Sequence, residues 1–277
     1  MRFASCSIAG RRFAALVEGD VVRPLHGIDQ LGAATPLEVL ASPPVGDEAI
    51  PLTAVELLPV IPRPGKVLCI GLNYREHVAE GTFEVPEYPV LFTKFAECLV
   101  GAGAPVRLPP ESTAPDYEAE LAVVVGRTIR RVHPDRALES VAGYTAANDV
   151  TMRDFQYRSH QWLQGKAWSD STPLGPFLVT PDEVGDPHCL DIRLELNGRE
   201  LQSANTSMMI FDIPTLLATI SEFVQLEPGD VVLTGTPSGV GFRRDPPVRL
   251  TDGDRVVVEI ERVGRLENPV LAEAGAQ

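Results

Sequence analysis

The sequence predicts a β-rich α+β protein. Short runs of branched apolar residues recur along the chain, and turns containing glycine or proline separate them. The 277 residues include 23 glycines and 25 prolines, which suits many short strands joined by tight turns. Clear helical periodicity is scarce. We therefore expect sheets to form the main layers, with a few helices added to them.

A small N-terminal α+β domain is expected over residues 1–62. Two strands flank a Glu-Gly-Asp turn, and a brief helix follows. These elements are predicted at residues 13–17, 21–25 and 36–40. Three prolines and a glycine then occur within residues 59–65, a composition typical of a domain boundary. The main domain is therefore predicted at residues 63–277.

The main domain contains further strand-like runs. They are predicted at residues 67–70, 121–125, 192–196, 231–234 and 256–260. Asn197-Gly198 is a strong hairpin signal. The best helix is predicted over residues 213–223, because Pro214 lies in the first turn and apolar residues recur at helical spacing after it.

Charge and cysteine usage exclude several classes of protein. The chain has 24 Lys plus Arg against 38 Asp plus Glu, a net charge of −14, which argues against nucleic acid and anionic membranes as partners. Its four cysteines form no C-x-x-C pair, so we expect reduced thiols rather than a structural zinc site. Neither a signal peptide nor a membrane-spanning run is evident. These features predict a cytoplasmic protein.

Two carboxylates are predicted to lie side by side. Glu118 and Glu120 precede a branched apolar run, and residues i and i+2 of a strand point to the same face. Two like charges this close favour a cation between them, and oxygen ligands favour Mg²⁺, Mn²⁺ or Ca²⁺ over zinc. The alternative is the solvent face of an edge strand. Asp149 follows about thirty residues later, and spacing alone does not connect it to the pair.

A histidine and a glutamate share one face of the next predicted helix. Asn73 and Glu76 form a candidate N-cap and capping box at its start. His77 and Glu80 then stand at i, i+3, so that Glu80 could fix the tautomer of an imidazole that accepts a proton from water. The alternative is an ordinary surface pair.

Other polar residues are candidates for contact with a ligand. Lys166 lies between two tryptophans and could offer its charge to an anion, or it could be a snorkelling surface lysine. Arg153 and Gln156 follow Asp149 closely and could line the same cavity. Thr236 belongs to the glycine-rich loop of residues 234–241, which could present N–H groups to a carboxylate. No Gly-x-Ser-x-Gly elbow and no dinucleotide fingerprint occurs.

Six segments occur together in one order. They are Gly71-Leu72-Asn73-Tyr74 with His77 and Glu80; Asp116-Tyr117-Glu118-Ala119-Glu120-Leu121; Gly143-Tyr144 with Asn148-Asp149-Val150 and Arg153-Asp154-Phe155-Gln156; Gly165-Lys166 with Pro173-Leu174-Gly175-Pro176; Asn197-Gly198 with Gln202, Asn205 and Thr206; and Pro228-Gly229-Asp230 with Thr234-Gly235-Thr236-Pro237 and Gly239-Val240-Gly241. In these segments the chain resembles the fumarylacetoacetate hydrolase family. The resemblance implies the family's mixed β-sandwich or roll for the C-terminal domain, and a homodimer.

The resemblance also implies roles for the candidate residues. The carboxylates of Glu118, Glu120 and Asp149 would hold Mg²⁺ or Mn²⁺. His77 and Glu80 would activate water, and Lys166 would face the substrate. Arg153, Gln156 and Thr236 would lie near the substrate. The chain departs from many relatives at Ala167-Trp168, where they read Ser-Phe, and at Phe95, where they have proline after Thr-Lys.

The expected function is metal-dependent hydrolysis of a C–C bond in an acylpyruvate-like β-diketo 2-oxo acid. In this mechanism the metal stabilises an enolate and His77 activates water. The alternative is an isomerase or decarboxylase of unsaturated 2-oxo dicarboxylates, of the hydroxyheptadienedioate isomerase or oxaloacetate decarboxylase type. A catalytically silent metal-binding or assembly protein is a third hypothesis. The expected partner is a small-molecule 2-oxo acid.

Overall fold

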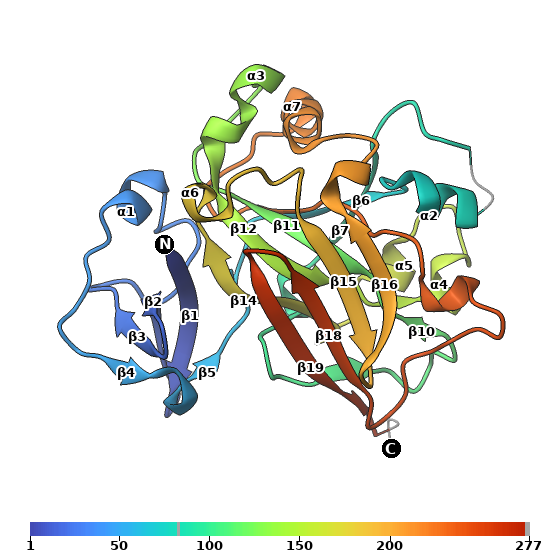
Figure 1. Ribbon diagram of the computed structural model, residues 1–277, viewed down its shortest axis with the longest axis horizontal. Helices are drawn as coiled ribbons and strands as arrows, with labels where there is room; N and C mark the ends of the chain where they lie inside the picture. Colours follow the sequence, from blue (N-terminus) through green and yellow to red (C-terminus); the bar gives the residue numbers. More distant parts are fainter. Residues whose placement is uncertain (82–83, 275–277) are drawn as a thin grey trace.

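One long mixed sheet runs through the molecule (Figure 1). The computed structural model describes residues 1–81 and 84–274. The sheet has 12 strands, of which β5 (Glu56–Leu57) pairs with β1 and β8 (Leu99–Val100) pairs with β14. The remaining order is β4 (Ile50–Pro51), β3 (Val21–Pro24), β2 (Arg11–Glu18), β1 (Arg2–Ile8), β14 (Thr172–Val179), β12 (Val141–Asn148), β11 (Ala119–Val125), β17 (Val231–Leu233), β6 (Val67–Gly71) and β7 (Val90–Lys94).

A second sheet of five strands packs against the middle of the long one (Figure 1). Its order is β16 (Arg199–Asn205), β15 (Asp191–Leu196), β18 (Arg255–Ile260), β19 (Gly264–Ala272) and β9 (Val106–Leu108). A two-stranded sheet joins β10 (Pro115–Asp116) to β13 (Thr151–Met152). Asn197 and Gly198 connect β15 to β16 with φ angles of 54° and 80°, so the predicted hairpin turn is confirmed.

Strand β11 is buried on both faces. Leu121 and Val123 face a core shared with the five-stranded sheet and helix α7, whereas Ala122 and Val124 face a second core shared with the N-terminal strands. Burial on both faces explains why the strand reads as an almost continuous apolar run. Because its neighbours on either side hold it, β11 provides a rigid base for the polar residues at its start.

The helices are short, apart from α7. Their bounds are α1 (Leu37–Ala41), α2 (Arg75–Glu80), α3 (Pro134–Ala137), α4 (Arg153–Gln156), α5 (Leu163–Lys166), α6 (Pro181–Val184) and α7 (Ile213–Phe223). Asp212 caps α7 by accepting a hydrogen bond from Thr215 N at 2.9 Å, and Pro214 lies in the first turn. The prediction for residues 213–223 is therefore confirmed. No helix in the described part of the chain is long and apolar enough to cross a membrane.

The N-terminal segment continues the long sheet. Its predicted strands and helix are present within two residues of their expected bounds. Strand β1 pairs with β14, where Phe3 lies opposite Leu178, and Ser5 Oγ donates to Val60 O at 3.0 Å. Phe3 and Leu178 share one core with Val124 of β11. The boundary at residue 62 stays a prediction.

The predicted capping box at α2 is wrong. The helix begins at Arg75 and receives no side-chain cap. The Asn73 amide instead donates to Thr234 O at 2.7 Å and to Phe211 O at 3.1 Å, and it accepts from Phe211 N at 2.8 Å. A buried amide that can satisfy three backbone groups is more valuable there than at an exposed cap. Asn73 therefore ties the start of α2 to two distant loops.

Candidate active site

Three buried carboxylates converge at one end of strands β11 and β12. In the antiparallel pairing Ala119 lies opposite Asn148, so that Glu118 and Asp149 become neighbours just beyond the paired residues. Asp149 N donates to Glu118 O at 2.9 Å. Oxygen atoms of Glu118, Glu120 and Asp149 all lie within 4.8 Å of one another. These residues, called the carboxylate cluster below, are buried, so the solvent-face alternative is wrong.

Cations surround two members of the carboxylate cluster. Lys166 Nζ lies 2.7 Å from Glu118 Oε2 and 2.8 Å from Asp149 Oδ2, and its residue is only 2 % exposed. The snorkelling alternative for Lys166 is therefore wrong. Lys94 Nζ lies 2.6 Å from Asp149 Oδ1, and Arg153 Nη2 lies 2.7 Å from Glu118 Oε1. Although burial opposes ionisation, Lys166 and Arg153 hold the pKa of Glu118 at about 2.

Glu120 has a different environment. Its Oε2 accepts a hydrogen bond from Gly235 N at 2.7 Å, and it forms no ion pair with a lysine or arginine within residues 1–81 and 84–274. Burial, together with the charges of Asp149 and Glu118, raises its pKa well above the usual range. A divalent cation at the cluster would offset this repulsion, and a set of carboxylate oxygens matches Mg²⁺ or Mn²⁺. The residues therefore fit a metal ion.

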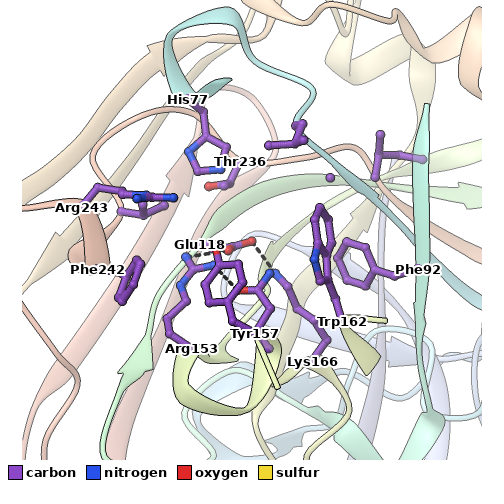
Figure 2. A pocket seen from close by; sticks show the side chains of 15 residues that line it. His77, Phe92, Glu118, Arg153, Tyr157, Trp162, Lys166, Thr236, Phe242 and Arg243 are labelled. Atoms are coloured by element: carbon purple, nitrogen blue, oxygen red, sulfur yellow. Dashed lines mark hydrogen bonds and ion pairs between the residues drawn. The ribbon is translucent and has the colours of Figure 1, made fainter. Parts of the chain in front are cut away.

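His77 and Glu80 form the predicted pair on α2. His77 Nδ1 lies 3.3 Å from Glu80 Oε2, and the two side chains are 14 % and 21 % exposed. Gly239 N donates to both Glu80 oxygens, at 3.1 and 3.2 Å. Glu80 is therefore held from the opposite loop, which distinguishes this pair from an ordinary surface pair. His77 lines the same pocket as Glu118 (Figure 2).

The other predicted residues line this pocket as well. Gln156 Oε1 accepts from Arg153 Nη1 at 3.0 Å, and both residues come from α4. Thr236 Oγ1 accepts from Gln202 Nε2 at 2.9 Å, while Gln202 Oε1 accepts from Ala119 N at 2.9 Å. Gln202 thus fixes the glycine-rich loop against β11. The structure brings eight of the nine predicted site residues to one pocket or to the carboxylate cluster, and the ninth, Glu80, contacts His77 of the pocket lining.

Several residues around the pocket were not predicted. Lys94, from β7, forms an ion pair with Asp149 of the carboxylate cluster. Asp116, from β10, forms an ion pair with Arg153. Trp162 packs edge-on against Phe92, with ring centroids 5.8 Å apart, and forms one wall. Gly71 permits this wall, because a Cβ there would lie 2.3 Å from Trp162 Cζ3.

The opposite rim of the pocket is aromatic and basic. Tyr157 and Phe242 lie with ring centroids 5.9 Å apart, and Arg243 follows Phe242 (Figure 2). Together with His77, these residues are called the rim below. Phe242 and Arg243 directly follow the Gly239-Val240-Gly241 segment. Their place next to that segment is the signal that could have identified them.

Comparisons with known proteins agree with this geometry. The family model "Fumarylacetoacetate (FAA) hydrolase C-terminal" matches residues 66–271. Oxaloacetate tautomerase fahd2, mitochondrial, from Xenopus laevis is 47 % identical over 219 residues, which are 78 % of this chain and 69 % of that protein. The oxaloacetate tautomerase FAHD2A, mitochondrial, of Homo sapiens is 47 % identical over 224 residues, covering 80 % of this chain and 71 % of that protein.

A solved structure matches over nearly the whole length. The 5-carboxymethyl-2-hydroxymuconate delta-isomerase of Mycobacterium smegmatis is 35 % identical with a TM-score of 0.84, covering 99 % of this chain and 100 % of that one. Because these similar proteins carry the names of enzymes, the comparisons support an enzyme. They favour the isomerase alternative over the expected hydrolase.

Proposed function

Because the chain belongs to the fumarylacetoacetate hydrolase family, we propose that it is a divalent-metal-dependent isomerase that interconverts the keto and enol forms of a 2-oxo dicarboxylate such as oxaloacetate. One observation carries the proposal. His77, which contacts Glu80, and Glu118 of the carboxylate cluster line one pocket. The names of the similar proteins support the choice of reaction.

Glu118, Glu120 and Asp149 would hold the metal ion. When bound, the ion would supply Lewis-acid chemistry at the keto oxygen of the substrate. Lys166 Nζ and Arg153 Nη2 each form an ion pair with a Glu118 carboxylate oxygen at 2.7 Å, which keeps this ligand ionised and fixed in place. Fixed ligands cost little reorganisation when charge develops on the substrate.

His77 would carry out the proton transfer. In the keto-to-enol direction, its imidazole takes the proton from C3 as the C3–H bond breaks and the C2=C3 double bond forms, and the imidazolium then gives this proton to the former keto oxygen. Glu80 accepts from the other ring nitrogen and stabilises the imidazolium that forms. The reverse sequence returns the proton to C3. No atom is gained or lost overall, in keeping with an isomerase.

Hydrolysis of a C–C bond in a β-diketo 2-oxo acid is the second candidate. The His77–Glu80 pair favours it, because the same base could activate water instead of removing a proton from carbon. A single panel separates the candidates. The protein would be incubated with Mg²⁺ or Mn²⁺ and with oxaloacetate or acetylpyruvate, and both enol absorbance and released products would be measured.

The proposed isomerase accelerates equilibration between the enol and keto forms of oxaloacetate without releasing pyruvate. Release of acetate and pyruvate from acetylpyruvate, with no effect on oxaloacetate, would replace the proposal by the hydrolase. Release of CO₂ from oxaloacetate at a rate matching that of enol loss would indicate the decarboxylase. The homodimer and the cytoplasmic location stay predictions.

A further inference from the structure

One buried carboxylate outside the carboxylate cluster contacts residues from both ends of the pocket. Asp116 of β10 is only 1 % exposed. Its Oδ2 accepts hydrogen bonds from Arg153 Nε at 2.8 Å and from Phe242 N at 3.1 Å. Its Oδ1 accepts a hydrogen bond from Gly241 N at 2.8 Å. Asp116 therefore joins Arg153 of α4 to the loop that carries the rim residue Phe242.

Arg153 continues this connection to Glu118, the proposed metal ligand. Its Nη2 lies 2.8 Å from Asp116 Oδ2 and 2.7 Å from Glu118 Oε1 (Figure 2). A guanidinium is planar, and this one is buried between the two carboxylates, so its orientation toward Glu118 depends on the partner on its other side. Groups that orient a metal ligand in this way contribute to metal affinity.

The loop lies as close to Asp116 as its sequence allows. Gly241 and Phe242 begin a 3₁₀ turn over Gly241–Arg243, and both of their N–H groups donate to Asp116. A Cβ at Gly241 would lie 2.6 Å from Asp116 Oδ1 and would also collide with Val248 O. Because Phe242 lines the pocket, the place of its ring depends on where Asp116 holds this backbone.

A carboxylate suits this place better than a neutral amide. Asp116 accepts hydrogen bonds from the loop and from Arg153. An amide of the same shape has one oxygen and one NH₂ group, so either the loop or the guanidinium would face a second donor. If Asp116 were only a counter-ion for Arg153, its contacts with the loop backbone would be dispensable, since Glu118 also pairs with that guanidinium.

We propose that Asp116 is a positioning residue that sets both ends of the pocket. It orients Glu118 through Arg153, and it places Phe242 through the backbone of the loop. This inference rests on the proposed function, because it takes Glu118 as a metal ligand and Phe242 as a contact of the 2-oxo acid. Asp116 acts only through these residues, so its loss weakens metal binding and raises KM together, with a smaller effect on kcat.

The test is Asp116→Asn, which keeps the shape of the side chain and removes its charge. Calorimetric titration without substrate gives the Mn²⁺ affinity, and kinetics with oxaloacetate at saturating Mn²⁺ give kcat and KM. We expect the Mn²⁺ affinity to fall about 10- to 100-fold, as for other residues behind a metal ligand. We expect KM to rise about 10-fold, the equivalent of about one hydrogen bond.

Asp154→Asn is the matched control. Asp154 also holds a loop, through Ser112 Oγ at 2.6 Å and Thr113 N at 3.1 Å, but among the described residues it forms no ion pair with Arg153. The Mn²⁺ affinity and KM of this variant stay at the wild-type values. Melting temperatures verify that each variant retains the fold.

Gly241→Ala perturbs the same contact from the loop side and decides the question if Asp116→Asn does not fold. It weakens Mn²⁺ binding although Gly241 lies outside the carboxylate cluster. Wild-type Mn²⁺ affinity in Gly241→Ala would overturn the inference while the proposed function stands. A folded Asp116→Asn variant in which Mn²⁺ affinity and KM do not both change would do the same.

A different result would bear on the proposed function instead. Wild-type protein that binds Mn²⁺ but does not accelerate the equilibration of oxaloacetate would overturn that function. The Mn²⁺ titrations of Asp116→Asn and Gly241→Ala need no substrate, so they would still decide whether Asp116 orients Glu118.

Discussion

The inner end of the pocket and its rim are built in different ways. At the inner end, the carboxylate cluster is buried, and its Asp149 forms ion pairs with the buried Lys94 and Lys166. At the rim, a short helix and a loop carry His77 and Arg243, and Phe242 is 37 % exposed. Charges at the inner end are coupled to stability as well as to metal binding, whereas substitutions at the rim act on catalysis and substrate choice with little effect on folding.

The sharpest test of this difference is His77→Asn. Removing the proposed base from the rim lowers kcat for oxaloacetate tautomerisation about 10²- to 10⁴-fold, the usual contribution of general acid–base catalysis. The affinity for Mn²⁺ changes little, because His77 is not a member of the carboxylate cluster. Steady-state kinetics and a metal titration measure the two effects. His133→Asn, at an exposed histidine on the N-terminal side of α3, is the control. Full activity of His77→Asn would remove the base from the mechanism.

Lys94→Met tests the inner end through stability. The substitution removes one of the two lysines that pair with the fully buried Asp149 and leaves only Lys166, at 2.8 Å. Unfolding in metal-free buffer therefore becomes easier by about 3 kcal/mol, the lower end of the cost of breaking a buried ion pair. Denaturant unfolding gives the value. Arg136→Met breaks an exposed pair with Glu139 and causes no measurable change. Equal stability of the two variants would show that burial of the pair has no energetic consequence.

Glu120→Gln separates metal binding from stability at the inner end. Loss of a ligand weakens Mn²⁺ binding at least about 100-fold, since even loss of a residue behind a ligand costs 10- to 100-fold. Metal-free protein retains its stability, because the substitution removes a carboxylate repelled by Asp149 and Glu118. Calorimetric titration and melting curves provide the readouts. The control is Glu111→Gln, at an exposed residue. Unchanged Mn²⁺ affinity would contradict the proposed ligand set.

Gly71→Ala gives the smallest expected effect and tests the wall between the two regions. The new methyl group would meet Trp162 at 2.3 Å, so the indole must move, at a cost of about 1–3 kcal/mol. Tryptophan fluorescence and denaturant unfolding report the change. In the Gly71→Ala, Trp162→Phe double variant the smaller ring relieves most of the cost. If the single variant matches the wild type in both measurements, the wall is not rigid.

The fold was predictable where the signal was local. The strands at residues 67–70, 192–196 and 256–260 are present within one residue of their predicted bounds, since branched apolar runs ending at turns determine them. The order of strands in the sheets was not predictable. The pairing of β1 with β14 joins residues more than 170 positions apart, and no local pattern specifies such a partner.

The candidate site divides in the same way. The His77–Glu80 pair follows from helical spacing, and the side-by-side glutamates follow from the alternation of a strand. Asp149 reaches the carboxylate cluster because Ala119 of β11 pairs with Asn148 of β12. The spacing of these residues along the sequence does not determine that register. Lys94 reaches Asp149 from a strand at the edge of the sheet, so its role depends on tertiary structure alone.

The most direct measurement is the rate at which the enol of oxaloacetate disappears, followed by its ultraviolet absorbance, with protein freed of metal by dialysis against a chelator. We expect no acceleration by the dialysed protein. Added Mg²⁺ or Mn²⁺ should restore the full rate, beyond the rate that the same ion gives without protein. Equal rates with and without added metal, or no acceleration over the ion alone, would contradict it.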